Sequence, residues 1–211
     1  MKKIMFSERY GLEQAVLAGT KTMTRRLMTM TLHKKNGEKM EPVVPDNMFI
    51  KDGVAYFCLG NLAHKVPKEN QPAYKVGEEV WVAQSYKNLG YKPDDWIENT
   101  EGGYQQAHEF AGYTNKMFVR SIYLTHRIRI TGIKVERLQD ITEQECTCEG
   151  IKIKKGNRNG ECPFGEFTFD GWDDYSFTAS EAFAALIDRI SGRGTWQSNP
   201  WVYAYTFELI K

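Results

Sequence analysis

Alternating apolar and polar positions predict strands in the middle and at the end of the 211-residue chain. In "HRIRITGIKVERL" the isoleucines and valine alternate with polar residues, which predicts one long strand, bent or bulged at Gly132. "KVGEEVWVAQSY" and "NPWVYAYTFELI" predict two further strands, because both are rich in β-branched and aromatic residues. "FIKDGVAYFCL" predicts a hairpin that turns at Asp52-Gly53.

A short helix is predicted over residues 8–18, where apolar side chains recur every three or four positions. Ser7 is its expected N-cap, and Gly19 is the expected left-handed residue that ends it. The polar run "GTKTMTRR" begins where this helix stops, so it belongs to a turn or an extended segment. Residues three apart face opposite sides of an ideal strand. Lys21 and Thr24 therefore act together only if the backbone between them bends.

Two more helices are predicted in the second half of the chain. Thr142, with Glu145 three residues later, forms a capping box in front of a helix over about 143–149. Ser180 is the expected cap of the amphipathic helix "EAFAALIDRISG". Strands and helices mix without the regular alternation of a doubly wound sheet. We therefore expect an α+β fold, with a small, mostly antiparallel barrel or curled sheet and flanking helices.

Two irregular stretches are predicted to be insertions in a single domain that spans residues 1–211. Residues 28–75 are polar and rich in turn formers, and residues 88–116 combine a Gly-Gly pair with scattered aromatics. No apolar run approaches the roughly 18 residues of a transmembrane helix. The start, "MKKIMFSERYG", has too short an apolar stretch for a secretory signal, so a cytoplasmic protein is expected.

The net charge is only +1, but the charges are unevenly distributed. Residues 1–40 hold nine Lys or Arg against three Asp or Glu, and residues 139–188 hold four against eleven. On one fold this separation either steers a polyanion toward the basic end or merely marks two solvated faces.

The four cysteines are expected to stay reduced, and their spacing lacks the paired ligands of a structural zinc site. They are Cys58, Cys146, Cys148 and Cys162. We expect neither a bound metal nor a cofactor.

Familiar catalytic motifs are absent from the sequence. "AGTKT" is no phosphate-binding loop, since Thr20 separates the glycine from the lysine. No G-x-G-x-x-G or G-x-S-x-G sequence occurs, and the four histidines are interpreted as solvated or structural. What remains is the cluster Lys21, Thr22, Thr24, Arg25 and Arg26. A lysine in a partly dry cleft loses proton affinity and can activate a hydroxyl. The same residues are also consistent with cations that only stabilise the C-terminal end of the preceding helix.

Four separated segments resemble the ASCH domain family in its phage and prophage form. "GTKTMTRR" is similar to the family signature Gly-x-Lys-x-x-(Thr/Glu)-x-Arg, and "VGEEVWVAQSY" to the strand that follows it. "RIRITGIKVERLQDITEQECTCEGI" is similar to the next strand and helix, which end in Glu-Gly-Ile. "FAALIDRISGRGTWQSNPWVYAYTFEL" is similar to the closing helix and strand. These segments lie in the family's order and cover roughly half of the chain.

The resemblance implies a PUA-like fold, a small β-barrel related to RNA-binding and RNA-modifying modules. Some small ASCH enzymes are amidohydrolases that deacetylate N4-acetylcytidine. By this resemblance Lys21 is the general base, Thr24 the nucleophile and Glu149 the acid. The residues implied to bind the nucleotide or RNA are Thr22, Arg25, Arg26, Arg127 and Arg129.

Other readings stay open at this point. A non-catalytic RNA-binding module would use the same cations on phosphates and Trp81 or Tyr86 for base stacking. A phage-derived accessory protein would instead bind another protein. Glu149 is equally consistent with a catalytic acid and with a solvated residue at a helix end. Gln84 stands where phage-type members commonly carry Glu. The oligomeric state is left undetermined.

Overall fold

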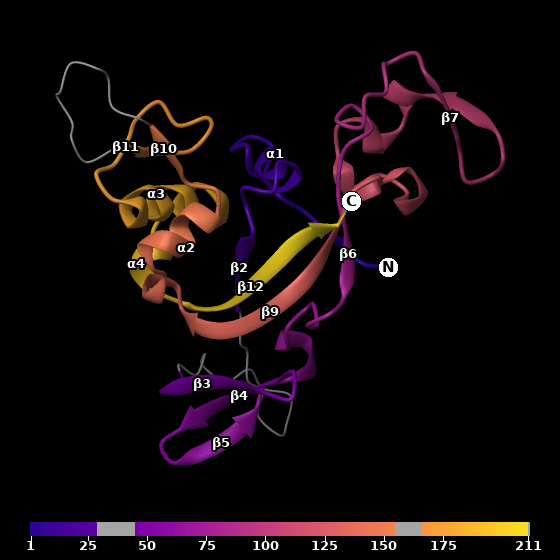
Figure 1. Ribbon diagram of the computed structural model, residues 1–211. Helices are drawn as coiled ribbons and strands as arrows, with labels where there is room; N and C mark the ends of the chain where they lie inside the picture. The colour runs from indigo at the N-terminus through magenta and orange to yellow at the C-terminus, as the bar shows by residue number, and fades with distance from the viewer. Residues whose placement is uncertain (29–44, 155–165, 211) are drawn as a thin grey trace, which may run out of the picture.

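The computed structural model describes residues 1–28, 45–154 and 166–210. Its main sheet has five strands in the order β1-β6-β9-β12-β2 (Figure 1). These are β1 (Lys3–Ile4), β2 (Met23–Leu27), β6 (Glu79–Val82), β9 (Arg127–Arg137) and β12 (Trp201–Ile210). β1 and β6 run parallel, and the other neighbours in this sheet are antiparallel.

Three smaller antiparallel sheets surround the main one. Their strands are β3 (Asn47–Lys51), β4 (Val54–Leu59) and β5 (Leu62–Lys65), then β7 (Trp96–Glu98) with β8 (Tyr104–Gln106), and β10 (Lys152–Lys154) with β11 (Glu166–Thr168). The α-helices are α1 (Leu12–Leu17), α2 (Glu143–Cys148), α3 (Ala179–Ser191) and α4 (Thr195–Ser198). Short 3-10 helices are η1 (Lys68–Asn70), η2 (Ala107–Glu109), η3 (Ala111–Tyr113), η4 (Lys116–Phe118), η5 (Ser121–Tyr123) and η6 (Leu138–Asp140).

The long strand β9 is bulged where the sequence predicts it. Gly132 pairs with Thr206 of β12, but Ile130 pairs with Phe207, so Thr131 is the extra residue. A Cβ atom on residue 132 would lie 2.6 Å from the Thr206 hydroxyl oxygen, so only glycine fits here without a shift. Figure 1 shows β9 and β12 as two long, curved strands side by side.

The two edges of the main sheet approach each other. Nη2 of Arg26, on edge strand β2, donates to the carbonyl of Met5, just after the opposite edge strand β1. In the described part of the chain β1 and β2 form no ladder, so the sheet is curled but not closed. The fold is therefore α+β with mostly antiparallel sheets, as predicted.

The main core lies between this sheet and helices α1, α2 and α3 (Figure 1). It includes Val16 of α1, Ile128 of β9, Leu186 of α3 and Val202 of β12, each almost fully buried. Burial of such side chains contributes about 1.5–3 kcal/mol each and holds the helices against the strands.

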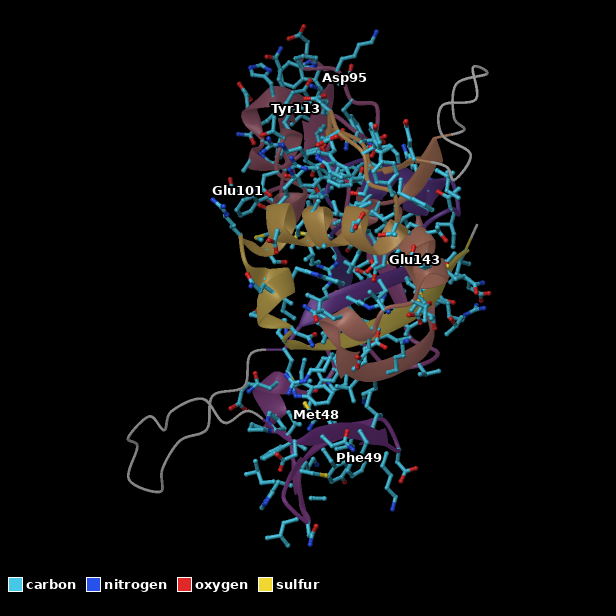
Figure 2. All side chains as sticks on the ribbon, turned by 90° about the vertical axis from the view of Figure 1, so that its left-hand side faces the viewer. Met48, Phe49, Asp95, Glu101, Tyr113 and Glu143 are labelled. Atoms are coloured by element: carbon cyan, nitrogen blue, oxygen red, sulfur yellow. The ribbon has the colours of Figure 1, made fainter. Side chains whose placement is uncertain are left out.

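The described parts of the two predicted insertions lie at opposite ends of the molecule in both views (Figures 1 and 2). The β3-β4-β5 sheet adds Met48 and Phe57 to the main core. Residues 88–116 contribute Ile97 and Ala107 to a second, small core, which the flanking residues Tyr86, Val119 and Leu124 complete. This stretch is thus ordered over short strands and 3-10 helices, whereas its sequence shows only weak signals of order.

Two predicted helix starts are wrong and other turn predictions are confirmed. α1 begins at Leu12 and not at residue 8, because Gly11 takes a left-handed φ of 65° and residues 8–11 form a turn. α3 is capped by Thr178, whose hydroxyl accepts from the Glu181 amide, so Ser180 lies within the first turn. The capping box at Thr142, the left-handed Gly19 and the Asp52-Gly53 hairpin turn are confirmed.

Within the described ranges, the helices are all too short or too polar to cross a lipid bilayer.

Candidate active site

Lys21 is buried in the turn between α1 and β2. Gly19, with φ 73°, ends the helix, and the amides of Thr20 and Lys21 both donate to the Ala15 carbonyl. This turn ends at Lys21, and β2 begins only at Met23, so Lys21 lies outside the strand that contains Thr24. The Lys21 side chain is about 1% exposed in an ion pair with Glu149.

Glu149 faces Lys21 from the end of α2. The Lys21 ammonium donates to the Glu149 carboxylate at 2.7 Å and to the Glu149 carbonyl at 2.6 Å. Gly150 follows with φ 104°, and a Cβ there would lie 3.0 Å from Leu12 Cδ2 and 3.7 Å from Lys21 Cδ. Glycine therefore lets the helix end approach the lysine closely, and it makes Glu149 part of the site.

Thr24 lines the same pocket as Lys21 and Glu149, which has a volume of about 190 Å³. The threonine side chain is in β2 and is almost fully buried. The opposite wall is apolar and comes from α3, with Phe183, Leu186 and Ile187. The structure thus brings the three residues implied as base, nucleophile and acid into one small, largely apolar pocket.

Arg25 is fixed by three glutamates next to this pocket. Its Nε and Nη2 donate to Glu136 Oε1 at 3.0 and 2.7 Å, and Nη2 also donates to Glu145 at 2.8 Å. Nη1 donates to Glu149 Oε1 at 3.1 Å. Burial alone would lower the pKa of Arg25, but the three carboxylates outweigh it and raise that pKa. Arg25 therefore orients Glu149, and its predicted role in binding phosphate is not supported by this geometry.

Lys134 completes the charge cluster from the solvent side. Its ammonium lies 2.5 Å from Glu145 Oε1 and 2.7 Å from Glu136 Oε2. Burial would raise the pKa of Glu145, but the hydrogen bonds from Lys134 and the Thr142 amide, with the charge of Arg25, lower it. The sequence marks Glu145 only as a helix cap. Lys134 and Glu136 are two positions apart on β9 and therefore share one face of the strand. This spacing is the sequence feature from which their pairing could have been predicted.

Burial also changes the proton affinity of Lys21. It lowers the pKa of the ammonium, because a dry environment disfavours the charged form, and the Glu149 carboxylate only partly offsets this. The nearby charges of Arg26 and Arg25 lower the same pKa further. Lys21 is therefore easier to deprotonate than an exposed lysine, as a general base requires.

The remaining predicted binding residues fall in different places. Arg26 is exposed and lines the mouth of the pocket. Thr22 does not line it, and its backbone bonds to Cys148 and Phe207. Arg127 and Arg129 lie elsewhere on the sheet surface, paired with Glu79 and Glu208.

The arginines of β9 form ion pairs across the strands. Arg127 binds Glu79 at 2.8 Å, and Arg129 binds Glu79 at 3.2 Å and Glu208 at 3.0 Å. Trp81 packs under Arg127, with the guanidinium carbon 5.4 Å from the ring centroid. Both arginines are therefore paired on the sheet surface, where their side chains remain 37% and 46% exposed.

The aromatic and thiol candidates are also placed. Tyr86 is 1% exposed in the small second core, so it offers no open face to a base. Cys58, Cys146 and Cys148 are free thiols, and burial raises the pKa of Cys146 to about 12, which makes it a poor nucleophile. Cys162 and His33 lie outside the described residues. In the described ranges no three His, Cys, Asp or Glu side chains gather to hold a metal ion.

Comparisons of the chain with protein-family models, with curated proteins and with solved structures found no match. The resemblance to the ASCH family therefore stays a prediction that rests on the four sequence segments.

Proposed function

We propose that the pocket around Lys21, Thr24 and Glu149 hydrolyses a short acyl amide on a cytidine-type base, in a nucleoside or in RNA. We also propose that the chain has an ASCH-like fold, in which the curled sheet corresponds to the PUA-like barrel. The main support for the hydrolase proposal is that residues 128 positions apart place a lysine ammonium 2.7 Å from a buried carboxylate, with Thr24 among the residues that line the same pocket.

A proton shared by Lys21 and Glu149 supplies both the acid and the base. Lys21 and Glu149 form an ion pair in the structure, and Arg25 also binds the carboxylate. A substrate that fills the pocket excludes water and disfavours the two separate charges. Transfer of the proton over the 2.7 Å hydrogen bond then gives a neutral amine and a carboxylic acid, one to accept and one to donate a proton.

The reaction then proceeds in two balanced steps. The Lys21 amine takes the hydroxyl proton as Thr24 Oγ1 attacks the acyl carbon, and Glu149 protonates the departing amine as the C–N bond breaks. The acyl group is now an ester on Thr24, opposite a Lys21 ammonium and a Glu149 carboxylate. Water attacks this ester, Glu149 takes the proton of the water, and Lys21 returns a proton to Thr24 Oγ1. The carboxylic acid is released and the neutral pair is restored.

The size of the pocket limits the substrate. Its volume of about 190 Å³ is below the roughly 300–1,000 Å³ of pockets that enclose a whole drug-sized ligand. Only the acylated end of the base fits inside, against the apolar wall of α3. The sugar and phosphates stay at the mouth, next to Arg26. An acetyl group is therefore preferred over longer acyl groups.

The test is acetate release from N4-acetylcytidine by the wild-type protein and three variants. Lys21→Met, Thr24→Val and Glu149→Gln are expected to lose about 100-fold or more in kcat/KM, the usual contribution of one acid, base or nucleophile. Thr131→Val is the matched control, because this exposed hydroxyl lies at the bulge of β9, away from the pocket. Circular dichroism checks that each variant is folded.

Absence of turnover at high wild-type concentration would remove the hydrolase proposal. Salt-sensitive RNA binding, retained by Thr24→Val, would then favour the non-catalytic binding module.

A further inference from the structure

A second, separate pocket lies between the end of β6, the start of β9 and the 88–116 insertion. Its volume is about 350 Å³, and it shares no lining residue with the first pocket. The lining residues that carry polar or aromatic groups include Gln84, Asn88, Tyr91, Asp95, Tyr123 and His126. The labelled Asp95 marks this end of the molecule in Figure 2.

Gln84 lines this pocket with a buried amide that is held on one side. The residue is 3% exposed, and its Oε1 lies 3.0 Å from His126 Nδ1, which also contacts the Thr125 hydroxyl at 2.9 Å. The other amide atom has no hydrogen-bond partner within the described residues. Exchanging the amide O and N leaves this conclusion unchanged, since one atom still binds His126 and the other still lacks a partner.

Asn88 supplies a second oriented amide. Its Nδ2 donates to Glu13 at 2.9 Å, and Glu13 is itself buried and held by Lys116 at 2.7 Å. One N–H of the amide is therefore used within the protein, and this bond fixes the orientation of a side chain whose Oδ1 is an acceptor without a partner among the described residues. The pocket combines this acceptor with the Gln84 amide.

The walls and charge of the pocket point to the ligand class. Tyr91 and Tyr123 are partly exposed, with ring centroids 6.2 Å apart in an edge-to-face arrangement. No Lys or Arg is among the described residues that line the pocket, and Asp95 brings a carboxylate, so a phosphate group is disfavoured. Aromatic walls with fixed amide groups suit a flat, uncharged ring with donors and acceptors on its edge.

We propose that this second pocket binds an uncharged nucleobase, either of a free nucleoside or of single-stranded RNA. A volume of about 350 Å³ is sufficient for a base with its sugar. The proposal does not rest on the hydrolase activity, because it involves neither the acyl group nor the first pocket.

The test is calorimetric titration of the full chain with adenosine, cytidine, guanosine and uridine, and with single-stranded RNA pentamers. At least one probe is expected to bind, and Gln84→Leu is expected to weaken this binding roughly tenfold through the lost buried hydrogen bond. Gln105→Leu is the matched control, because this glutamine is exposed on β8 and does not line the pocket. Tighter binding of a pentamer identifies RNA as the source of the base, and equal binding identifies the nucleoside.

Two results would overturn the proposal. One is that no probe binds at millimolar concentration. The other is that a probe binds but neither Gln84→Leu nor Tyr91→Leu weakens it. Tyr91→Leu removes part of the aromatic wall, and it keeps the test decisive if Gln84→Leu does not fold. The probes carry no acyl group, so failure of the hydrolase proposal leaves both results interpretable.

Discussion

Two ion-pair clusters in this molecule use the same chemistry in different surroundings. The buried cluster joins Lys21 and Arg25 to Glu136, Glu145 and Glu149. The surface ladder, on β6, β9 and β12, joins Arg127 and Arg129 to Glu79 and Glu208. The distances between charged atoms overlap, but the cations of the buried cluster are 1% exposed, and those of the surface ladder are 37% and 46% exposed.

The difference shows how burial changes what an ion pair does. Solvent and salt screen exposed pairs, which typically contribute about 0–1 kcal/mol. Removing one partner of a buried pair typically costs about 3–5 kcal/mol, because an uncompensated charge remains in a dry site. The same dryness lowers the pKa of Lys21. Burial therefore makes the buried cluster important for stability and lowers the pKa of its lysine, whereas the surface ladder only links neighbouring strands.

The largest expected effect is that of Arg25→Met. This change removes the cation that the three carboxylates share, although Lys134 and Lys21 still bind them, and we expect it to lower the free energy of unfolding by about 3 kcal/mol. Urea unfolding measures this loss. Arg127→Met is the matched change in the surface ladder and is expected to have a much smaller effect. Equal losses in the two variants would show that burial does not distinguish the clusters.

Gly150→Ala tests the close approach that forms the buried cluster. At φ 104° a side chain is strained, and its Cβ would lie 3.0 Å from Leu12, so we expect a cost of about 1–3 kcal/mol and a fall in turnover. Gly53→Ala is the control, since Gly53 has φ 74° but no atom within 4 Å of the added Cβ. It should show the strain without the loss of turnover. Unchanged turnover in Gly150→Ala would show that the close approach of the α2 end to Lys21 is not needed for activity.

The smallest expected effect is the pH dependence that Lys21 adds to stability. Between the lowered pKa of folded Lys21 and its ordinary 10.5, the unfolded chain binds more protons, so this residue makes stability rise with pH. Buried Tyr205, whose pKa is raised to about 12, acts in the opposite direction above its ordinary 10. The difference between wild type and Lys21→Met in unfolding at several pH values isolates the lysine. A difference that does not change with pH would contradict the lowered pKa.

Local sequence patterns predicted the elements of the main sheet better than they predicted the site. The bulge at Gly132 and the capping box at Thr142 depend on neighbouring residues, so the sequence displays them directly. Lys21, Thr24 and Glu149 were identified through resemblance, because no local rule shows that a lysine will meet a glutamate 128 positions later.

What the sequence does not display has the same physical origin. Arg25 was predicted to bind the nucleotide or RNA, and the carboxylates that fix it come from β9 and α2, more than 100 residues away. The uneven charge left open either a basic face for a polyanion or two solvated faces, and in the structure Lys21 and Arg25 pair with the acidic segment itself. Residues 88–116 lack strand or helix periodicity because they form only two three-residue strands, 3-10 helices and turns.

The wide sequence separation of these contacts also sets when the first pocket forms during synthesis. Its lining extends from Met5 to Ser191, so an emerging chain cannot complete the pocket until α3 has left the ribosome. Until then, Lys21 in the turn after α1 and Arg25 in β2 lack the glutamates that pair with them in the folded protein. The early chain is consequently a cationic, solvated segment, and the buried ion-pair cluster and its pocket form late in synthesis.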